Sequence, residues 1–425
     1  MLSQAGIKSK NKKAQPGRRA LDGVKVVDIS NFLAAPLTSM FLADFGAEVI
    51  KVERPDNGDE MRYWGENKDG VGLYFKVINR NKKSVTLDLK SSFGVEAVKR
   101  LIKDADIIIE NFRPGTLEKW GLGYDVLSAV NPGLIMLRVS GFGQTGPYKE
   151  RPGFGTLAEA YAGFANITGF PENPPLLPPF GLADSTTGLM GAYLAMVALH
   201  ERNQNGGPGQ VIDLAIYEPL FSLLGPQAVN YDQLGLIQQR QGSRLPFTAP
   251  RNTYETRDGK WVSIAGSAQS IFIRICGALD IPDLVKDPRF ADNRVRLKNA
   301  MKLDEALQAA IAKIDIKDLL ERFNRAGAAI APVNDIAQIF EDPHFKAREN
   351  IVAVEDDELG GEVRMQNVVG KLSQTPGCIE RAGPRLGEHN REILVEQLGF
   401  TTEELAAAGI DPDPRKDDPS SEQPG

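Results

Sequence analysis

The feature that most constrains the fold is an alternation of short β-rich runs with helical stretches across residues 21–142. The run DIIIENF at 106–112 is apolar almost throughout, which is typical of a strand covered on both faces. This alternation predicts an α/β fold with a parallel sheet. The expected strands are 24–30, 48–53, 84–89, 106–112 and 134–140, and the expected helices are 37–46 and 95–105.

The chain has 425 residues, and its character changes outside this region. A polar stretch that contains Pro and Gly leads to an expected hairpin around Asp258-Gly259 and then to several helical segments. These features predict a linker and a smaller α+β domain over 226–335. A further hairpin is expected around Gly360-Gly361. The basic residues 1–20 and residues 409–425 are predicted to be disordered tails.

Composition excludes several classes of protein. The chain carries 50 Lys+Arg against 56 Asp+Glu, and its net charge of -6 argues against a general nucleic-acid binder. Its two cysteines, Cys276 and Cys378, can build neither a disulfide framework nor a Cys-rich metal site, so a cytoplasmic location is expected. The N-terminus lacks the apolar core of a signal peptide. No apolar run reaches about 18 residues without interruption, so no membrane span is expected.

A glycine-rich segment, GFGQTG at 141–146, has the spacing of a dinucleotide-binding loop. Such a site needs a helix that begins within the loop, so that the helix N-terminus faces the pyrophosphate. Pro147 and Pro152 follow instead and prevent a clean helix start. A flexible connecting or active-site loop is therefore the favoured interpretation.

The chain has only three histidines, His200, His344 and His389, and each has a structural interpretation in a helix end or a turn. Mechanisms that need a histidine base are therefore weakened. A carboxylate nucleophile needs no base, because its ordinary pKa of about 3.9 leaves it ionised at neutral pH. A thiol leaving group, with a pKa of about 8.5, needs little help from an acid. Acyl transfer from a thioester to a carboxylate suits such a site.

The candidate carboxylate is Asp184, in the segment PPFGLADSTTGLMG. It precedes a long helix expected over 186–201, which is apolar on every face and is predicted to be deeply buried. Asp immediately before a helix is also a favoured N-cap, so a capping role and a nucleophilic role both remain open. The Gly- and Pro-rich approach and the small residues of the helix would let a ligand come close.

Several motifs occur in an order and spacing that resemble the family III CoA-transferases, which include formyl-CoA transferase and the carnitine CoA-transferases. The resemblance runs from about Leu21 to Leu405. The motifs are LDGVKVVDIS…AAP…LADFGAEVIKVERP, NRNKKSVTLDLK, DIIIENFRPGTLEKWGLGYD, SGFGQTGPYKERPGF, GLADSTTGLMGAYLAMVAL, GQVIDLAIYE and LGEHNREIL.

The resemblance implies an interlocked, ring-like homodimer. Each chain would have a Rossmann-like large domain made from both chain ends, here 21–225 and 336–408, with the smaller domain between them. Asp184 would attack an acyl-CoA and become an aspartyl-CoA thioester. A carboxylic acid would then receive the CoA. Acyl-CoA would be a substrate, and no permanent cofactor and no metal is implied.

The family's CoA contacts carry over by position. Lys119 stands where the family often has Arg, and the residues added to the motif matches are Arg113, Lys149 and Arg151. Because CoA carries several negative charges, Lys and Arg side chains suit it. The matched positions are Arg54, Leu87, Lys90, Asn111, Phe112 and Lys119.

The sequence departs from formyl-CoA transferase in two places. Leu33 stands where that enzyme has Gln, and no tetraglycine run is present in the smaller domain, so formyl or oxalyl specificity is not expected. Similar sequences favour succinyl-CoA and a dicarboxylate. Two alternatives remain: an acyl-CoA racemase or epimerase of the same superfamily, whose His is missing from the segment 151–155, and a non-catalytic subunit. The partner chain would be a second copy or a paralogue, with no nucleic acid and no membrane involved.

Overall fold

The computed structural model describes residues 18–414. Most of each predicted disordered tail therefore lies outside the described residues. The described part of the C-terminal tail differs from the prediction, because Ile410 is buried in the hydrophobic core and the Pro412 carbonyl accepts a hydrogen bond from Arg391 N at 3.1 Å.

The chain forms two compact units. Unit 1 is built from the segment that ends at Ala162, from Pro178–Gly225 and from the segment that begins at Ala347. Unit 2 consists of Gly163–Leu177 and Pro226–Lys346. The first of these segments joins unit 2 because Gly242 N donates to the Gly169 carbonyl at 2.9 Å.

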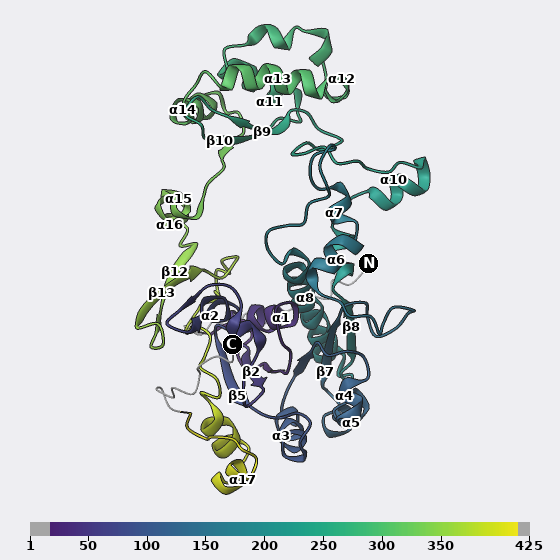
Figure 1. Cartoon of the computed structure of the whole chain (residues 1–425), viewed down its shortest axis with the longest axis vertical. Coiled ribbons are helices and arrows are strands. Elements are labelled where there is room, and N and C mark those ends of the chain that lie inside the picture. Colours follow the sequence, from purple (N-terminus) through teal and green to yellow (C-terminus); the bar gives the residue numbers. More distant parts are fainter. Residues whose placement is uncertain (1–17, 415–425) are drawn as a thin grey trace, which may run out of the picture. The chain divides into compact units, whose positions relative to one another are not determined.

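Unit 1 contains a six-stranded, all-parallel sheet, which confirms the predicted α/β fold with a parallel sheet (Figure 1). Alternate strand residues are buried on both faces: Val27 and Ile108 on one, Val26 and Ile107 on the other. This explains the nearly continuous apolar runs. In spatial order the strands are β5 (Lys82–Thr86), β2 (Glu48–Glu53), β1 (Lys25–Asp28), β6 (Ile107–Glu110), β7 (Ile135–Ser140) and β8 (Val211–Ala215).

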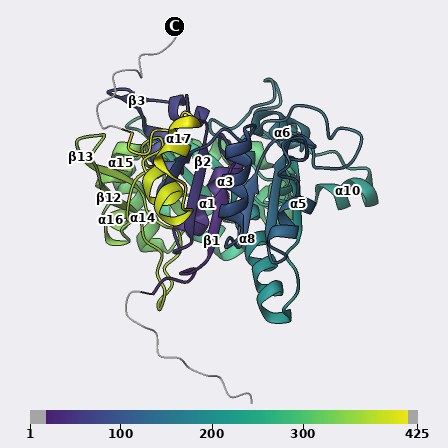
Figure 2. The same ribbon diagram turned by 90° about the horizontal axis from the view of Figure 1, so that it is seen from below.

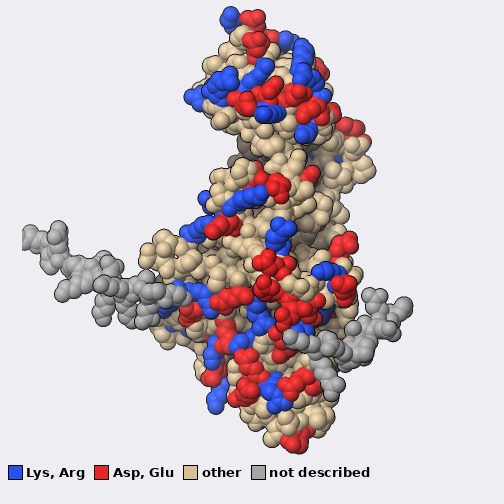
Figure 3. Space-filling view, turned by 90° about the vertical axis from the view of Figure 1, so that its left-hand side faces the viewer, with Lys and Arg blue, Asp and Glu red and all other residues tan. Residues whose placement is uncertain are grey.

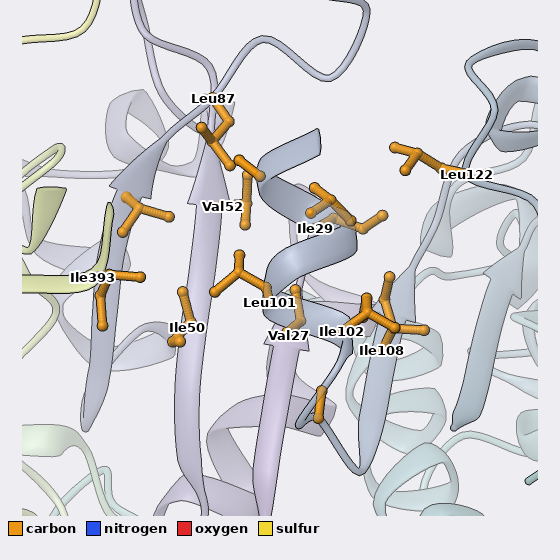
Figure 4. Packing of buried hydrophobic residues seen from close by; sticks show 14 of the residues in the cluster. Val27, Ile29, Ile50, Val52, Leu87, Leu101, Ile102, Ile108, Leu122 and Ile393 are labelled. Atoms are coloured by element: carbon orange, nitrogen blue, oxygen red, sulfur yellow. The ribbon is translucent and has the colours of Figure 1, made fainter. Parts of the chain in front are cut away.

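One face of this sheet is covered by α3 and by the C-terminal helices. Figure 4 shows Leu101 and Ile102 of α3 among side chains from the strands, with Ile393 of the C-terminal segment beside them. α3 and α17 lie on the side of the sheet that faces the viewer in Figure 2. The elements on this face are α3 (Ser92–Ile102), α4 (Thr116–Lys119), α5 (Tyr124–Val130), η4 (Arg391–Gln397) and α17 (Thr402–Ala407).

The other face carries α1 (Ala34–Ala43) and α8 (Leu182–Asn205), which cross at short range. A β-carbon at Gly188 would lie 2.5 Å from Leu37 Cβ, and one at Gly191 would lie 2.4 Å from Thr38 Oγ1. The glycines of α8 are therefore required for this close approach. The remaining elements of unit 1 are η1 (Glu60–Tyr63), β3 (Asn67–Lys68), β4 (Val71–Gly72), α2 (Leu73–Ile78), α6 (Gly155–Tyr161), α9 (Tyr217–Ser222), β12 (Ile351–Asp356) and β13 (Gly361–Gln366).

The burial predicted for α8 is only partly correct, because one side of the helix is exposed in the single chain. Its exposed apolar residues are Leu189, Tyr193, Met196 and Val197. By length and composition α8 could cross a membrane, with a mean hydropathy of 1.3, although a helix in the core of a protein passes the same test. No membrane span was expected from the sequence, because that prediction counted only uninterrupted apolar runs and α8 contains polar residues.

Unit 2 has its own hydrophobic core beneath a three-stranded antiparallel sheet. The hairpin predicted around Asp258-Gly259 joins β9 (Arg251–Glu255) to β10 (Trp261–Ala265). The other elements are α7 (Phe164–Ile167), α10 (Gln227–Leu234), α11 (Gln269–Ala278), η2 (Pro282–Val285), η3 (Pro288–Phe290), α12 (Asn293–Lys298), α13 (Ala300–Ile311), α14 (Ile316–Ala326), β11 (Ile330–Pro332), α15 (Ile336–Glu341) and α16 (Pro343–Ala347).

Candidate active site

Asp184 lies in the first turn of α8, which begins earlier than predicted. Gly181 occupies the N-cap position, and no side chain caps the helix from there. Asp184 is the third helical residue, so its side chain cannot be the N-cap. The capping interpretation of Asp184 is therefore wrong.

Glu159 of α6 satisfies the free end of α8 instead. The Ala183 backbone N–H donates to Glu159 Oε1 at 3.2 Å, and only 2% of Glu159 is exposed. The Glu159 carboxylate also suits the positive end of the helix dipole. The sequence analysis missed this residue, although an acid within the otherwise apolar and small segment GTLAEAY was a visible signal.

Two glycines shape the space around the Asp184 carboxylate. A β-carbon at Gly155 would lie 2.0 Å from Asp184 Oδ2, and one at Gly181 would lie 3.0 Å from the same atom. A β-carbon at Gly181 would also lie 2.7 Å from Leu33 Cδ2. The carboxylate is thus in close contact with backbone, at a place where larger residues would displace it.

The environment of Asp184 disfavours its charge. Burial, and after it the negative charge of Glu159, raises the pKa of Asp184 to about 6. Among residues 18–414, no side chain or backbone group forms a hydrogen bond with this carboxylate. Burial and the Asp184 charge also raise the pKa of Tyr74. A half-buried carboxylate without a hydrogen-bond partner, with its pKa raised, is typical of a functional group rather than a structural one.

The expected CoA residues lie in segments that follow the carboxyl ends of the strands, and all these strands end at the same edge of the parallel sheet. Arg54 follows β2, Leu87 and Lys90 follow β5, and Lys149 and Arg151 lie in the loop after β7. Figure 4 shows Leu87 beyond the tip of its strand. The positions after β6 are Asn111, Phe112, Arg113 and Lys119, the last at the end of α4.

The strand order places a topological switch between β1 and β6, which is where open α/β sheets bind ligands. At this point Asn31 N donates to Asn111 Oδ1 at 2.9 Å, and Asn111 Nδ2 donates to the Asn31 carbonyl at 2.7 Å. The Asn111 side chain therefore ties the two loops together. Asn31 was not singled out from the sequence, because its partner lies 80 residues away.

The other expected CoA-contacting residues differ in how much of each side chain is exposed to a ligand. Leu87 is 1% exposed, so only its backbone can meet a ligand. Phe112 packs on Trp120, with ring centroids 5.0 Å apart. Arg54 is half exposed and pairs with Glu60 at 2.8 Å.

The remaining basic candidates lie on the surface. The Arg151 guanidinium covers the Tyr148 ring at 3.6 Å, and Lys149 lies 4.0 Å from Glu150. Lys90, Arg113 and Lys119 are exposed. On the face drawn in Figure 3, Lys and Arg side chains are interspersed with Asp and Glu across the described residues. A highly anionic ligand would therefore be met by local groups of Lys and Arg.

The model of "CoA-transferase family III" matches residues 21–390 of this chain. The chain belongs to CoA-transferase family III. Its membership confirms the resemblance found in the sequence motifs, and the protein is a CoA-transferase that uses CoA thioesters as substrates.

Three relatives of this family III CoA-transferase are named as CoA-transferases that use succinyl-CoA or succinate. It is 46% identical to a succinyl-CoA–D-citramalate CoA-transferase of Chloroflexus aurantiacus, over 91% of this chain and 96% of the relative. It is 35% identical to a succinate–glutarate CoA-transferase of Agrobacterium fabrum, over 90% and 96%. It is 32% identical to the human succinyl-CoA:glutarate CoA-transferase, over 92% and 90%.

The fold of this family III CoA-transferase also has solved counterparts. A crystal structure of a CaiB/BaiF family protein from Brucella suis matches it with a TM-score of 0.79 and 35% identity. The match covers 89% of this chain and 99% of that protein. This chain therefore shares its mixed α/β fold with that protein.

Proposed function

We propose that Asp184 is the nucleophile of the transfer reaction. Its carboxylate attacks the thioester carbonyl of an acyl-CoA and expels the CoA thiolate, which leaves a mixed anhydride. The thiolate then attacks the aspartyl carbonyl, releases the acyl group as a carboxylate and forms an aspartyl-CoA thioester. An incoming carboxylate repeats these steps in reverse and leaves with the CoA. The observation that carries this proposal is the half-buried Asp184 carboxylate, which lies between Gly155 and Gly181 without a hydrogen-bond partner among the described residues.

Succinyl-CoA is the proposed donor and a dicarboxylic acid the proposed acceptor. The support comes from relatives whose names specify succinyl-CoA with citramalate, malate or glutarate. CoA is proposed to lie along the carboxyl edge of the sheet, where the exposed Lys90, Arg113 and Lys119 would meet its phosphates.

The active form is proposed to be a cytoplasmic dimer. The exposed apolar side of α8 supports this, because soluble monomers rarely leave large contiguous apolar patches uncovered. A second copy of the chain is the proposed partner. Since two Chloroflexus relatives are named alpha and beta subunits, a paralogue is the alternative partner.

A racemase of the same superfamily is the alternative reaction, and the histidines argue against it. His389 is buried, with Nδ1 3.2 Å from Ser84 N and Nε2 2.6 Å from Arg381. Burial, and after it Arg381, lowers the pKa of His389 to about 4. His200 and His344 are exposed, on α8 and α16. Among the described residues, no histidine of unit 1 contacts the Asp184 carboxylate.

Incubation with succinyl-CoA and a dicarboxylic acid in deuterated water tests the reaction type. We expect CoA to pass to the acid with no deuterium at the α-carbon, as followed by mass spectrometry. Hydroxylamine added during turnover should convert the activated Asp184 to a hydroxamate that peptide mapping detects. Rapid α-deuteration without CoA exchange would instead establish the racemase.

The transfer rate should depend on the protonation of Asp184. Since only the ionised carboxylate attacks, and its pKa is raised to about 6, kcat/KM should fall about tenfold per pH unit below that value. Replacement of Glu159 by Gln keeps an acceptor for Ala183 N but removes the negative charge that helps to raise the pKa of Asp184, so the inflection should move to lower pH. Glu321→Gln, at an exposed position on α14, is the matched control. An inflection identical in all three proteins would contradict the assignment.

A further inference from the structure

A second polar site lies within unit 2, in the loop that leads into β9 and on α13. It is a cavity of about 180 Å³, and none of its residues has been given a role above. Its polar lining consists of Gln241, Arg244, Thr248, Arg251 and Asp304.

Arg244 is oriented by a fully engaged carboxylate. Its Nε donates to Asp304 Oδ2 at 2.6 Å, and Asn252 Nδ2 donates to the same oxygen at 2.9 Å. The Tyr254 hydroxyl donates to Asp304 Oδ1 at 2.7 Å. The two terminal nitrogens of Arg244 form no hydrogen bond with the described residues. Asp304 thus holds the guanidinium while its outer edge remains available to a ligand.

Arg251 and Thr248 add further unused donors. One Arg251 terminal nitrogen donates to the Ser243 carbonyl, which fixes the side chain, and its Nε and other terminal nitrogen have no partner within 18–414. The Thr248 hydroxyl is buried and likewise has no hydrogen-bond partner among these residues. A buried hydroxyl without a partner is costly, so an oxygen-bearing ligand would compensate it.

Charge and size define the class of ligand. Two guanidinium groups against one carboxylate leave the cavity with a net charge that suits a single carboxylate better than a dianionic phosphate. The rest of the wall is apolar and suits a short methylene chain; it consists of Leu245, Pro246, Ala249, Leu297 and Ala300. A volume of about 180 Å³ accommodates a short aliphatic acid.

We infer that unit 2 carries a carboxylate-binding pocket, in which Arg244 and Arg251 hold one carboxylate of a short aliphatic dicarboxylic acid while its other carboxylate stays in solvent. Thr248 donates a further hydrogen bond, and the apolar wall contacts the methylene groups. The inference deepens the proposed function and rests on it for the identity of the acid. The binding itself requires no turnover.

Isothermal titration of the full chain with succinate tests this pocket. Loss of a charge-assisted hydrogen bond should weaken succinate binding by about ten- to a hundredfold in Arg251→Gln. Arg251→Lys, which keeps the charge but not the planar group, should lie between this variant and the unchanged protein. Arg322→Gln, at an exposed position on α14, should bind succinate like the unchanged protein. Circular dichroism reports whether each variant is folded.

Two further ligands establish the class. Butyrate should compete with succinate, because the pocket holds one carboxylate and a short chain, whereas inorganic phosphate should not. The inference fails if folded Arg244→Gln and Arg251→Gln both bind succinate as Arg322→Gln does, or if phosphate displaces succinate at equal concentration. If the arginine variants lose succinate binding and Asp184→Ala retains full turnover, the proposed nucleophile is wrong and the pocket is supported. If the arginine variants bind succinate normally and Asp184→Ala is inactive, the pocket is wrong and the nucleophile is supported.

Discussion

Replacement of Asp184 by Asn is expected to reduce CoA transfer by at least about 10³-fold, since an amide of the same shape cannot attack the thioester. Asp184→Ala should lose a similar factor, and it excludes residual activity from slow hydrolysis of the amide back to Asp. Neither variant should form a hydroxamate at this position. Turnover is measured with succinyl-CoA and a dicarboxylic acid, with Glu172→Gln as an exposed carboxylate control.

The same replacement should stabilise the protein at neutral pH. The folded pKa of Asp184, about 6, lies above the ordinary value of 3.8, so the folded state binds more protons between these values. The free energy of unfolding therefore falls as the pH rises from about 4 to 6, and the full loss, about 3 kcal/mol, persists above pH 6. Asp184→Asn removes this charge.

Urea unfolding at pH 4 and pH 8 separates the two effects. The Asn variant should exceed the unchanged protein in stability at pH 8 by more than it does at pH 4. A variant that is inactive and also less stable at pH 8 would mean that Asp184 supports the fold, which would contradict the role proposed for it. Stability gained where activity is lost is typical of a functional site.

The sequence predicted the sheet because its strands carry their own signal. DIIIENF becomes β6, and apolar residues on both faces of β1 and β6 account for the lack of alternation. The prediction was less accurate where charges are buried: β5 begins at Lys82, two residues before the expected strand. Lys82 looks like a surface residue in the sequence, yet it is fully buried because it pairs with Asp28 at 3.1 Å.

The sequence pointed to Asp184 as the candidate residue, but it did not reveal which residues surround Asp184. Asp184 at the start of a small-residue helix could be recognised locally. Glu159 beneath that helix and Asn31 opposite Asn111 act through contacts between distant segments, which periodicity and capping rules do not describe. Those rules also favoured the wrong role for Asp184, because they could not show that Glu159 already satisfies the helix end.

Replacement of Lys51 by Met is expected to cost about 3–5 kcal/mol of unfolding free energy, because it removes one partner of a buried ion pair. Lys51 Nζ lies 2.8 Å from Asp59 Oδ2 and donates to the Ser30 carbonyl at 2.9 Å, and both charged side chains are 0% exposed. Although burial alone would lower it, Asp59 and Asp28 raise the pKa of Lys51 above its ordinary value. Met fills a similar volume but leaves the Asp59 charge uncompensated.

The neighbouring Lys83 provides the matched control. It lies on β5 with its side chain 29% exposed and pairs with Glu48 and Glu392, each at 2.7 Å. Lys83→Met should cost about 1 kcal/mol or less, because solvent reaches the Lys83 ammonium group and compensates its partners. Chemical unfolding of both variants measures the difference, and equal costs would contradict the argument. The double variant Lys51→Met/Asp59→Asn should lose less than the two single variants together, since the unpaired charge is gone.

The ion pair also bears on the site, because Asp59 holds the loop between β1 and α1. Asp59 Oδ1 accepts a hydrogen bond from Phe32 N at 2.9 Å. Phe32 has a φ of +65°, a backbone conformation that residues other than glycine rarely adopt. Leu33, the next residue, contacts the Gly181 region beside Asp184. Lys51→Met should therefore lower kcat/KM as well as stability, whereas Lys83→Met should leave it unchanged. The charge pair thus acts on the site through the backbone it fixes.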